Sequence, residues 1–119
     1  MMIETNAGYW ETVIDISKSF PEDEIARTNP IDRTFVLRDD CSQIVQLHSI
    51  LHESIHIILD EIGKNDLSEQ EAFVGSLTDS LFGYIIRNEH YIKMIWEEAY
   101  RIKNINKLQE ADDEKNKSD

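Results

Sequence analysis

Apolar residues recur at steps of three and four along one stretch of the chain, and this spacing constrains the fold more than any other feature. Six of them fall on one face of a helix: Ile44, Leu47, Leu51, Ile55, Ile58 and Ile62. Gly63 follows directly, and a glycine just past the last turn commonly ends a helix. Asp40 or Ser42 is placed to cap its start. The pattern therefore predicts a long helix that ends at Gly63.

The first forty residues have a different character. Residues 13–16 and 34–38 are short β-branched or aromatic runs that are typical of strands. Pro21 and the pair Asn29-Pro30 lie between them and favour loops. This region therefore predicts a small β element ahead of the long helix.

Two more helices are predicted after Gly63. One opens at Ser68 and runs to about Arg87, and the next carries a clear apolar stripe: Ile92, Ile95, Ala99, Ile102 and Ile105. Trp96 and Tyr100 lie near this stripe, and we expect them to pack in the core, with a partner-binding or dimerisation face as the alternative. The layout is an α+β fold, with a small N-terminal β element followed by about three helices.

The length of the chain limits its organisation. A chain of 119 residues is long enough for one compact domain and too short for two. We expect a single domain over residues 1–109. Residues 110–119 have almost no apolar side chains and are predicted to form a disordered acidic tail.

Composition narrows the functional classes. The formal net charge is -12, from 12 basic and 24 acidic residues, and so acidic a surface repels phosphate backbones. No apolar run approaches the ~20 residues of a membrane span, and the N-terminus lacks the basic and apolar regions of a signal peptide. Cys41 is the single cysteine and cannot form an internal disulfide. We expect a cytoplasmic protein that binds neither nucleic acid nor membrane.

The sequence His52-Glu53-Ser54-Ile55-His56 lies within the first predicted helix. Residues i and i+4 share a helical face, so both imidazoles can reach one metal ion. Zinc suits two neutral imidazoles and an oxygen ligand, with a water in the open fourth position. The motif therefore predicts Zn²⁺ held by His52 and His56, with Glu53 as the general base that activates the zinc-bound water.

The stretch from Leu51 to Gly63 resembles the Leu-His-Glu-x-x-His-x-x-x-x-x-x-Gly sequence of small phage-type zincin-like metallopeptidases. Residues 67–74 with 81–82 are similar to the acidic helix that follows in that group, and residues 31–37 to the strand before it. The resemblance implies a gluzincin-like fold, distantly similar to ImmA/IrrE-type proteases, with the histidine motif on the first long helix. It also implies a hydrolase of phages or mobile elements that acts on protein or peptide substrates.

Zinc chemistry requires a third protein ligand from another element. Glu71 is the first candidate, because it falls one helix later and aligns with the acidic position of the family. Ser68-x-x-Glu71 is also a capping box, in which Glu71 would instead bond the Ser68 backbone N–H. Glu69 is the runner-up, since Glu69-x-x-Ala72 resembles the Glu-x-x-Ala pattern of related gluzincins, although Phe73 replaces the usual Asp or Asn.

Further polar residues are assigned by type and position alone. His48 and His90 lie outside the motif, and we expect a surface or packing role for His48 rather than a ligand role. Candidate acceptors for the second N–H of a ligating histidine are Asp60 and Asp79. Candidate oxyanion stabilisers are Tyr84 and Tyr91.

The leading functional hypothesis is zinc-dependent hydrolysis of peptide bonds. The substrate would lie extended along residues 35–37 if that strand is an exposed edge. The alternative is a metal-binding protein-interaction module without turnover, and a metal-free helical adaptor is a third possibility. Glu53 favours the enzyme, because structural zinc sites tend to be closed and rich in cysteine. The substrate, the cleavage specificity and the oligomeric state stay open.

Overall fold

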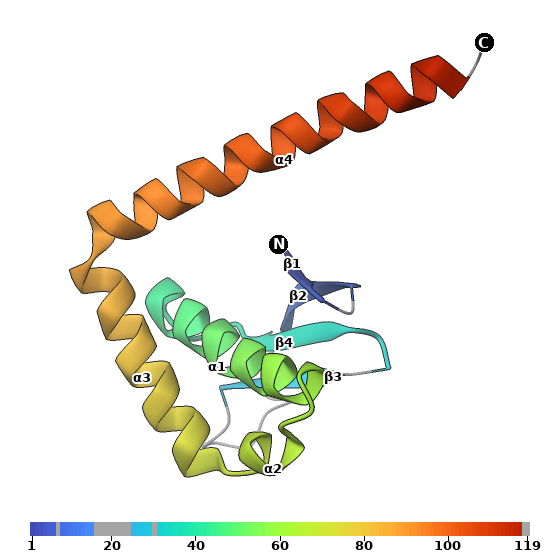
Figure 1. Ribbon diagram of the computed structural model, residues 1–119. Coiled ribbons are helices and arrows are strands. Elements are labelled where there is room, and N and C mark those ends of the chain that lie inside the picture. The colour runs from blue at the N-terminus through green and yellow to red at the C-terminus, as the bar shows by residue number, and fades with distance from the viewer. Residues whose placement is uncertain (7, 16–24, 30, 118–119) are drawn as a thin grey trace. The chain divides into compact units, whose positions relative to one another are not determined.

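A computed structural model describes residues 1–6, 8–15, 25–29 and 31–117 of the chain, and these form an α+β structure (Figure 1). The strands are β1 (Met2–Thr5), β2 (Gly8–Asp15), β3 (Ala26–Asn29) and β4 (Thr34–Arg38). The helices are α1 (Gln43–Glu61), α2 (Asn65–Ser68), α3 (Glu71–Arg87) and α4 (Glu89–Lys117). The predicted fold class is confirmed. Pro21 and Pro30, expected in loops, lie outside the described residues.

The chain divides into two compact units, Met1–Phe82 and Gly83–Asp119, so the boundary falls inside α3. The single domain expected over residues 1–109 stays a prediction. The helix α4 also continues to Lys117, through most of the segment expected to be a disordered tail. Residues 89–117 contain no glycine or proline and many helix-favouring Glu, Lys and Ala residues, which explains how a polar segment stays helical. Among the described residues, no helix combines the length and apolar character that crossing a membrane requires.

The four strands form one sheet in the order β1-β2-β4-β3. The pairs β1–β2 and β3–β4 are antiparallel, whereas β2 and β4 run parallel, with Thr12 opposite Phe35. Residues 34–38 are therefore an interior strand, and the expectation that they form an exposed substrate-binding edge is wrong. Phe35 and Leu37 are only 0% and 2% exposed. The edge strand beside β4 is β3, which the sequence did not predict.

The helix α1 has the boundaries that its sequence predicted. The Val45 backbone N–H donates to the Ser42 side chain, which caps the start. At the other end Ile62 is the C-cap and Gly63 follows with φ of +79°, a left-handed conformation that costs glycine no steric strain. Ser42 and Gly63 therefore mark the two ends of the helix, as the sequence predicted.

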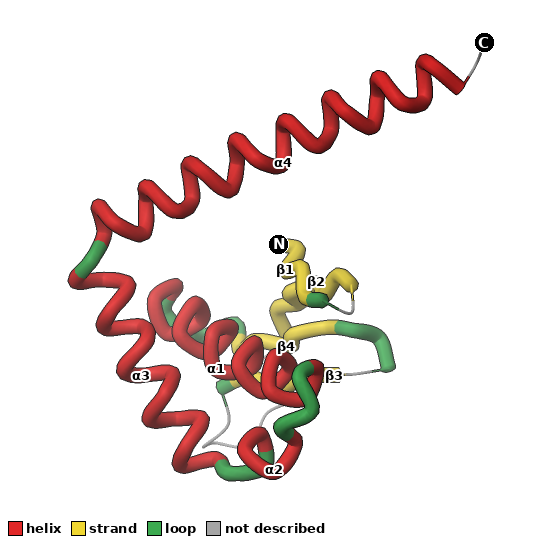
Figure 2. The backbone as a smooth tube through the Cα atoms, viewed as in Figure 1, coloured by secondary structure: helices red, strands yellow, loops and turns green. Residues whose placement is uncertain are grey.

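Two apolar clusters hold α1 in place. Ile57 packs with Trp10 and Phe35 of the sheet. Ile55 and Leu59 pack with Val74 of α3, which is fully buried. The helix thus uses one side against the sheet and another against α3, and the tube in Figure 2 shows α1 lying across the sheet in the first unit. The motif histidines lie on the part of α1 between these two apolar sides.

Candidate metal centre

The two histidines of α1 meet a carboxylate at the start of α3. His52 and His56 lie one helical turn apart, and Glu71 is the first residue of α3. Glu71 Oε1 lies 2.6 Å from Nε2 of His52 and 2.9 Å from Nε2 of His56. One potential ligand atom from each of the three residues lies within 4.8 Å of the other two. The structure therefore brings together the three residues that the sequence placed first as metal ligands.

The opposite nitrogen of each imidazole faces a buried hydroxyl. Nδ1 of His56 lies 3.2 Å from Ser68 Oγ, and Nδ1 of His52 lies 3.5 Å from Thr78 Oγ1. Both hydroxyls already donate to backbone carbonyls, Ser68 to that of His56 and Thr78 to that of Val74. Each hydroxyl oxygen can therefore accept the Nδ1–H of its ring when Nε2 binds a metal ion.

The Nε2 atoms of both rings point at one carboxylate oxygen, so the two imidazoles and Glu71 converge on a single point. A metal ligand of the histidine type normally has its other N–H fixed in this way. Two imidazole nitrogens and one carboxylate oxygen are the donor set of a catalytic zinc site, which keeps its fourth position open. The residues present therefore fit a zinc ion.

Glu71 has the charge that this role requires. Partial burial raises the pKa of its carboxyl, but the close contacts of that group with the His56 and His52 rings lower the pKa by more. The net effect is a carboxyl pKa below its ordinary value. Glu71 is therefore an anion at neutral pH.

The capping-box alternative for Glu71 does not occur. The Ser68 backbone N–H donates to the carbonyl of Lys64, inside α2, and the Ser68 side chain turns toward His56. Glu69, the runner-up ligand, is the exposed C-cap of α2 and is not part of the group around His52. Of the two glutamates weighed for the third position, the structure brings Glu71 to the histidines.

Glu53 lines a cavity of about 370 Å³ that also includes His52 and Glu71. The other lining residues are Ile25, Ala26, His48 and Ser49. Ala26 opens the edge strand β3, so the cavity lies between this strand and the polar face of α1. Glu53 is partly exposed there. A molecule bound in the cavity would contact the carboxylate and the metal-binding group together.

His48 and Asp79 form a pair of their own beside this cavity. Nε2 of His48 lies 2.8 Å from Asp79 Oδ1, and the His48 ring packs edge-on against Phe82. Asp79 therefore contacts His48 and not the Nδ1 atoms of His52 or His56, the role for which it was a candidate. The packing role expected for His48 is consistent with its contact with Phe82.

The remaining candidates are exposed residues of α1 and of the second unit. Asp60 is exposed on α1, and His90, Tyr84 and Tyr91 are exposed in the second unit. The residues that do contact the two Nδ1 atoms are Ser68 and Thr78, which the sequence had not assigned to the site. Thr78 had one signal, because a hydroxyl side chain four residues after Val74 falls on the apolar face of α3.

Comparison with known proteins adds no relative. No protein-family model matches the chain, no curated protein matches its sequence, and no solved structure matches it. The resemblance to zincin-like metallopeptidases therefore stays a prediction.

Proposed function

We propose that this chain is a zinc-dependent metallopeptidase whose metal ligands are His52, His56 and Glu71 and whose general base is Glu53. One observation carries the proposal. The Nε2 atoms of His52 and His56 both converge on the Glu71 carboxylate, while their Nδ1 atoms face the hydroxyls of Thr78 and Ser68. Three ligand atoms thus face one point, and each ring has an acceptor for its second N–H, which is the arrangement that suits a bound metal ion.

The chain's own residues supply the rest of the chemistry. When bound, zinc would polarise the scissile carbonyl and acidify a water molecule in the cavity. Glu53 follows His52 in the helix and lines the same cavity, so its carboxylate is placed to accept the proton of the attacking water. The same carboxylic acid then delivers that proton to the leaving amine.

The surroundings of the cavity suit an extended peptide. Ala26 belongs to β3, an edge strand whose outer backbone groups can pair with a peptide strand. A neighbouring hollow of about 250 Å³ shares Ile25, His48 and Ser49 with the cavity and is otherwise apolar. Its other lining residues are Ile44, Val45 and Phe82. An apolar substrate side chain beside the scissile bond would fit there.

The test compares Glu53→Gln with Glu69→Gln on the zinc-loaded protein, with a peptide library as substrate. Glu53→Gln removes the base without removing a ligand, so we expect zinc content to be kept and cleavage to fall about 10²–10⁴-fold. Glu69→Gln makes the same chemical change at an exposed position, and its cleavage should equal that of the wild type. Cleavage that survives Glu53→Gln would contradict the assigned base. A zinc-loaded wild type that cleaves no peptide would leave the alternative, a metal-binding interaction module without turnover.

A further inference from the structure

The helix α4 carries a large apolar surface that its own unit cannot cover. Eight large apolar or aromatic side chains on it are exposed: Tyr91, Met94, Ile95, Trp96, Tyr100, Ile102, Ile105 and Leu108. Among the described residues, the second unit contains only the end of α3, Asn88 and α4 itself. A helix of this kind normally gains its stability by packing an apolar face against a partner. The face therefore points to an interaction.

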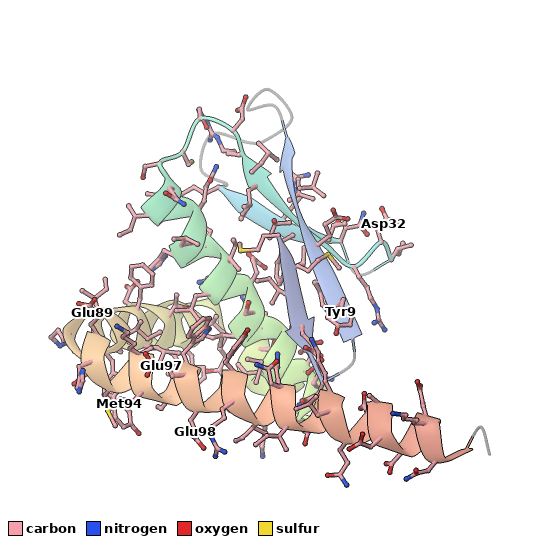
Figure 3. All side chains as sticks on the ribbon, turned by 90° about the horizontal axis from the view of Figure 1, so that it is seen from above. Tyr9, Asp32, Glu89, Met94, Glu97 and Glu98 are labelled. Atoms are coloured by element: carbon pink, nitrogen blue, oxygen red, sulfur yellow. The ribbon has the colours of Figure 1, made fainter. Side chains whose placement is uncertain are left out.

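Part of this face is hollowed. A groove of about 430 Å³ runs along α4, and it is lined by Tyr91, Met94, Ile95, Glu98, Ala99 and Ile102. Met94 and Glu98, one turn apart, project from the same side of the helix (Figure 3). Ala99 is the smallest lining residue, so a partner helix can approach most closely there. Side chains of a second helix would fit between the larger residues as knobs into holes.

The exposed apolar area is sufficient for a stable pair. Six of these side chains, all but Trp96 and Tyr100, lie on the groove side of the helix, and at exposures of 46–68% they present on the order of 600 Å² of surface. Two copies of this face would bury about 1,200 Å² in total, above the ~1,000 Å² expected of a specific interface.

The charges on α4 favour an antiparallel pair. Residues 91–108 carry four basic and two acidic side chains, whereas residues 110–114 carry four acidic side chains and no basic one. A parallel pair would place the two acidic segments side by side, where they repel. An antiparallel pair that crosses near Ala99 separates these segments and brings each one near residues 84–88 of the partner, where Arg87 is the only charged side chain. Avoided repulsion between the acidic segments thus favours the antiparallel orientation.

We propose that α4 is the interface of a two-fold symmetric dimer, in which the faces formed by residues 91–108 of two copies pack antiparallel and cross near Ala99. A two-fold axis brings the same patch of both subunits together, so one self-complementary face is enough. The dimer is independent of the metal centre, because every residue it uses lies in the second unit.

Sedimentation of the full chain tests the interface. We expect the wild type to sediment as a dimer at about 100 µM. Ile102→Glu places a charge in the apolar face and should weaken dimerisation at least tenfold. Asn104→Glu adds the same charge two residues away, outside the groove, and should leave the dimer intact. A wild type that remains monomeric at this concentration would overturn the proposal, as would equal dimerisation of the two variants.

Oxidative crosslinking tests the orientation, in a chain whose Cys41 is replaced by serine. Ala99→Cys lies near the two-fold axis and should crosslink readily. Leu108→Cys should not, because in an antiparallel pair the two copies of residue 108 lie about 27 Å apart along the axis. Efficient crosslinking at both positions would show a parallel pair and overturn the antiparallel arrangement. Circular dichroism of each variant checks that the helix content is unchanged.

Discussion

The helices α1 and α4 share one sequence pattern and differ in what that pattern does. Both carry apolar residues at steps of three and four. In α1 four apolar residues are buried, Ile50, Ile55, Ile57 and Leu59, and only Ile55 of them belongs to the stripe that predicted the helix. In α4 no described side chain is buried. Helical periodicity therefore identifies a helix, but which of its sides is covered depends on the rest of the fold.

The difference extends to the polar residues on each helix. In α1 the polar side chains between the two apolar sides are held by partners from α2 and α3, including Ser68, Glu71 and Thr78. In α4 the ion pair of Glu98 and Arg101 lies within the same helix. A functional site arises where polar residues are fixed by several elements, and α1 meets that condition.

Matched leucine truncations give the largest expected difference between the helices. Leu59→Ala removes a side chain packed against Ile55 and Val74, and we expect it to lower the free energy of unfolding by about 2–5 kcal/mol. Leu108→Ala removes a side chain that is 68% exposed, and we expect a change below about 0.5 kcal/mol. Urea denaturation at low protein concentration, where the chain is monomeric, measures both. Equal losses would show that α4 is covered as fully as α1.

Removal of a buried hydroxyl should have an intermediate effect, confined to the metal centre. Thr78→Val deletes the acceptor of the His52 Nδ1–H with little change in volume. Loss of such a partner typically weakens metal binding 10–100-fold. Competition with a zinc-binding dye measures this affinity. Ser68→Ala should act in the same way through His56, whereas Ser80→Ala, at an exposed position of α3, should bind zinc like the wild type. Unchanged zinc affinity in Thr78→Val would contradict the role assigned to Thr78.

The smallest effect is expected at two ion pairs, one in each unit, whose carboxylates are 49% and 57% exposed. The Arg38 guanidinium, which donates to Asp40, lowers the pKa of that carboxyl, and Arg101 does the same to Glu98. Because these folded-state pKa values are lowered, any stabilisation is present above the ordinary carboxyl pKa and is lost as the pH falls through the folded value. Arg38→Gln and Arg101→Gln should each raise the carboxyl pKa in an NMR titration, with no resolved change in stability at pH 7. A clear loss of stability in only one variant would show that the ion pairs of the two units contribute differently to stability.

The sequence predicted the parts of the fold that local signals determine. Ser42 and Gly63 bound α1 as expected, and the runs at residues 13–16 and 34–38 overlap β2 and β4. The strands β1 and β3 were missed because Met2–Thr5 is short and Ala26–Asn29 lacks a β-branched apolar run. Their positions depend on pairing with β2 and β4, which is a long-range property.

The sequence likewise predicted only part of the metal site. The spacing of His52 and His56 follows from helix geometry, and Glu71 was chosen over Glu69 by alignment with a family pattern. Neither Ser68 nor Thr78 could be placed at the histidines, because each reaches its ring only through the packing of α2 and α3 against α1. The contact of Asp79 with His48 depends on the same packing. A single sequence carries little information about side chains that act through tertiary contacts.

Metal content is the most direct test of the central claim that His52, His56 and Glu71 form a zinc site. Elemental analysis would compare untagged wild type, purified without chelator and supplied with zinc, with a His52→Ala/His56→Ala double variant and a His48→Ala/His90→Ala control that also lacks two histidines. We predict about one zinc ion per chain in the wild type and in the control, and almost none in the double variant. Equal zinc in all three proteins, or none in the wild type, would contradict the site.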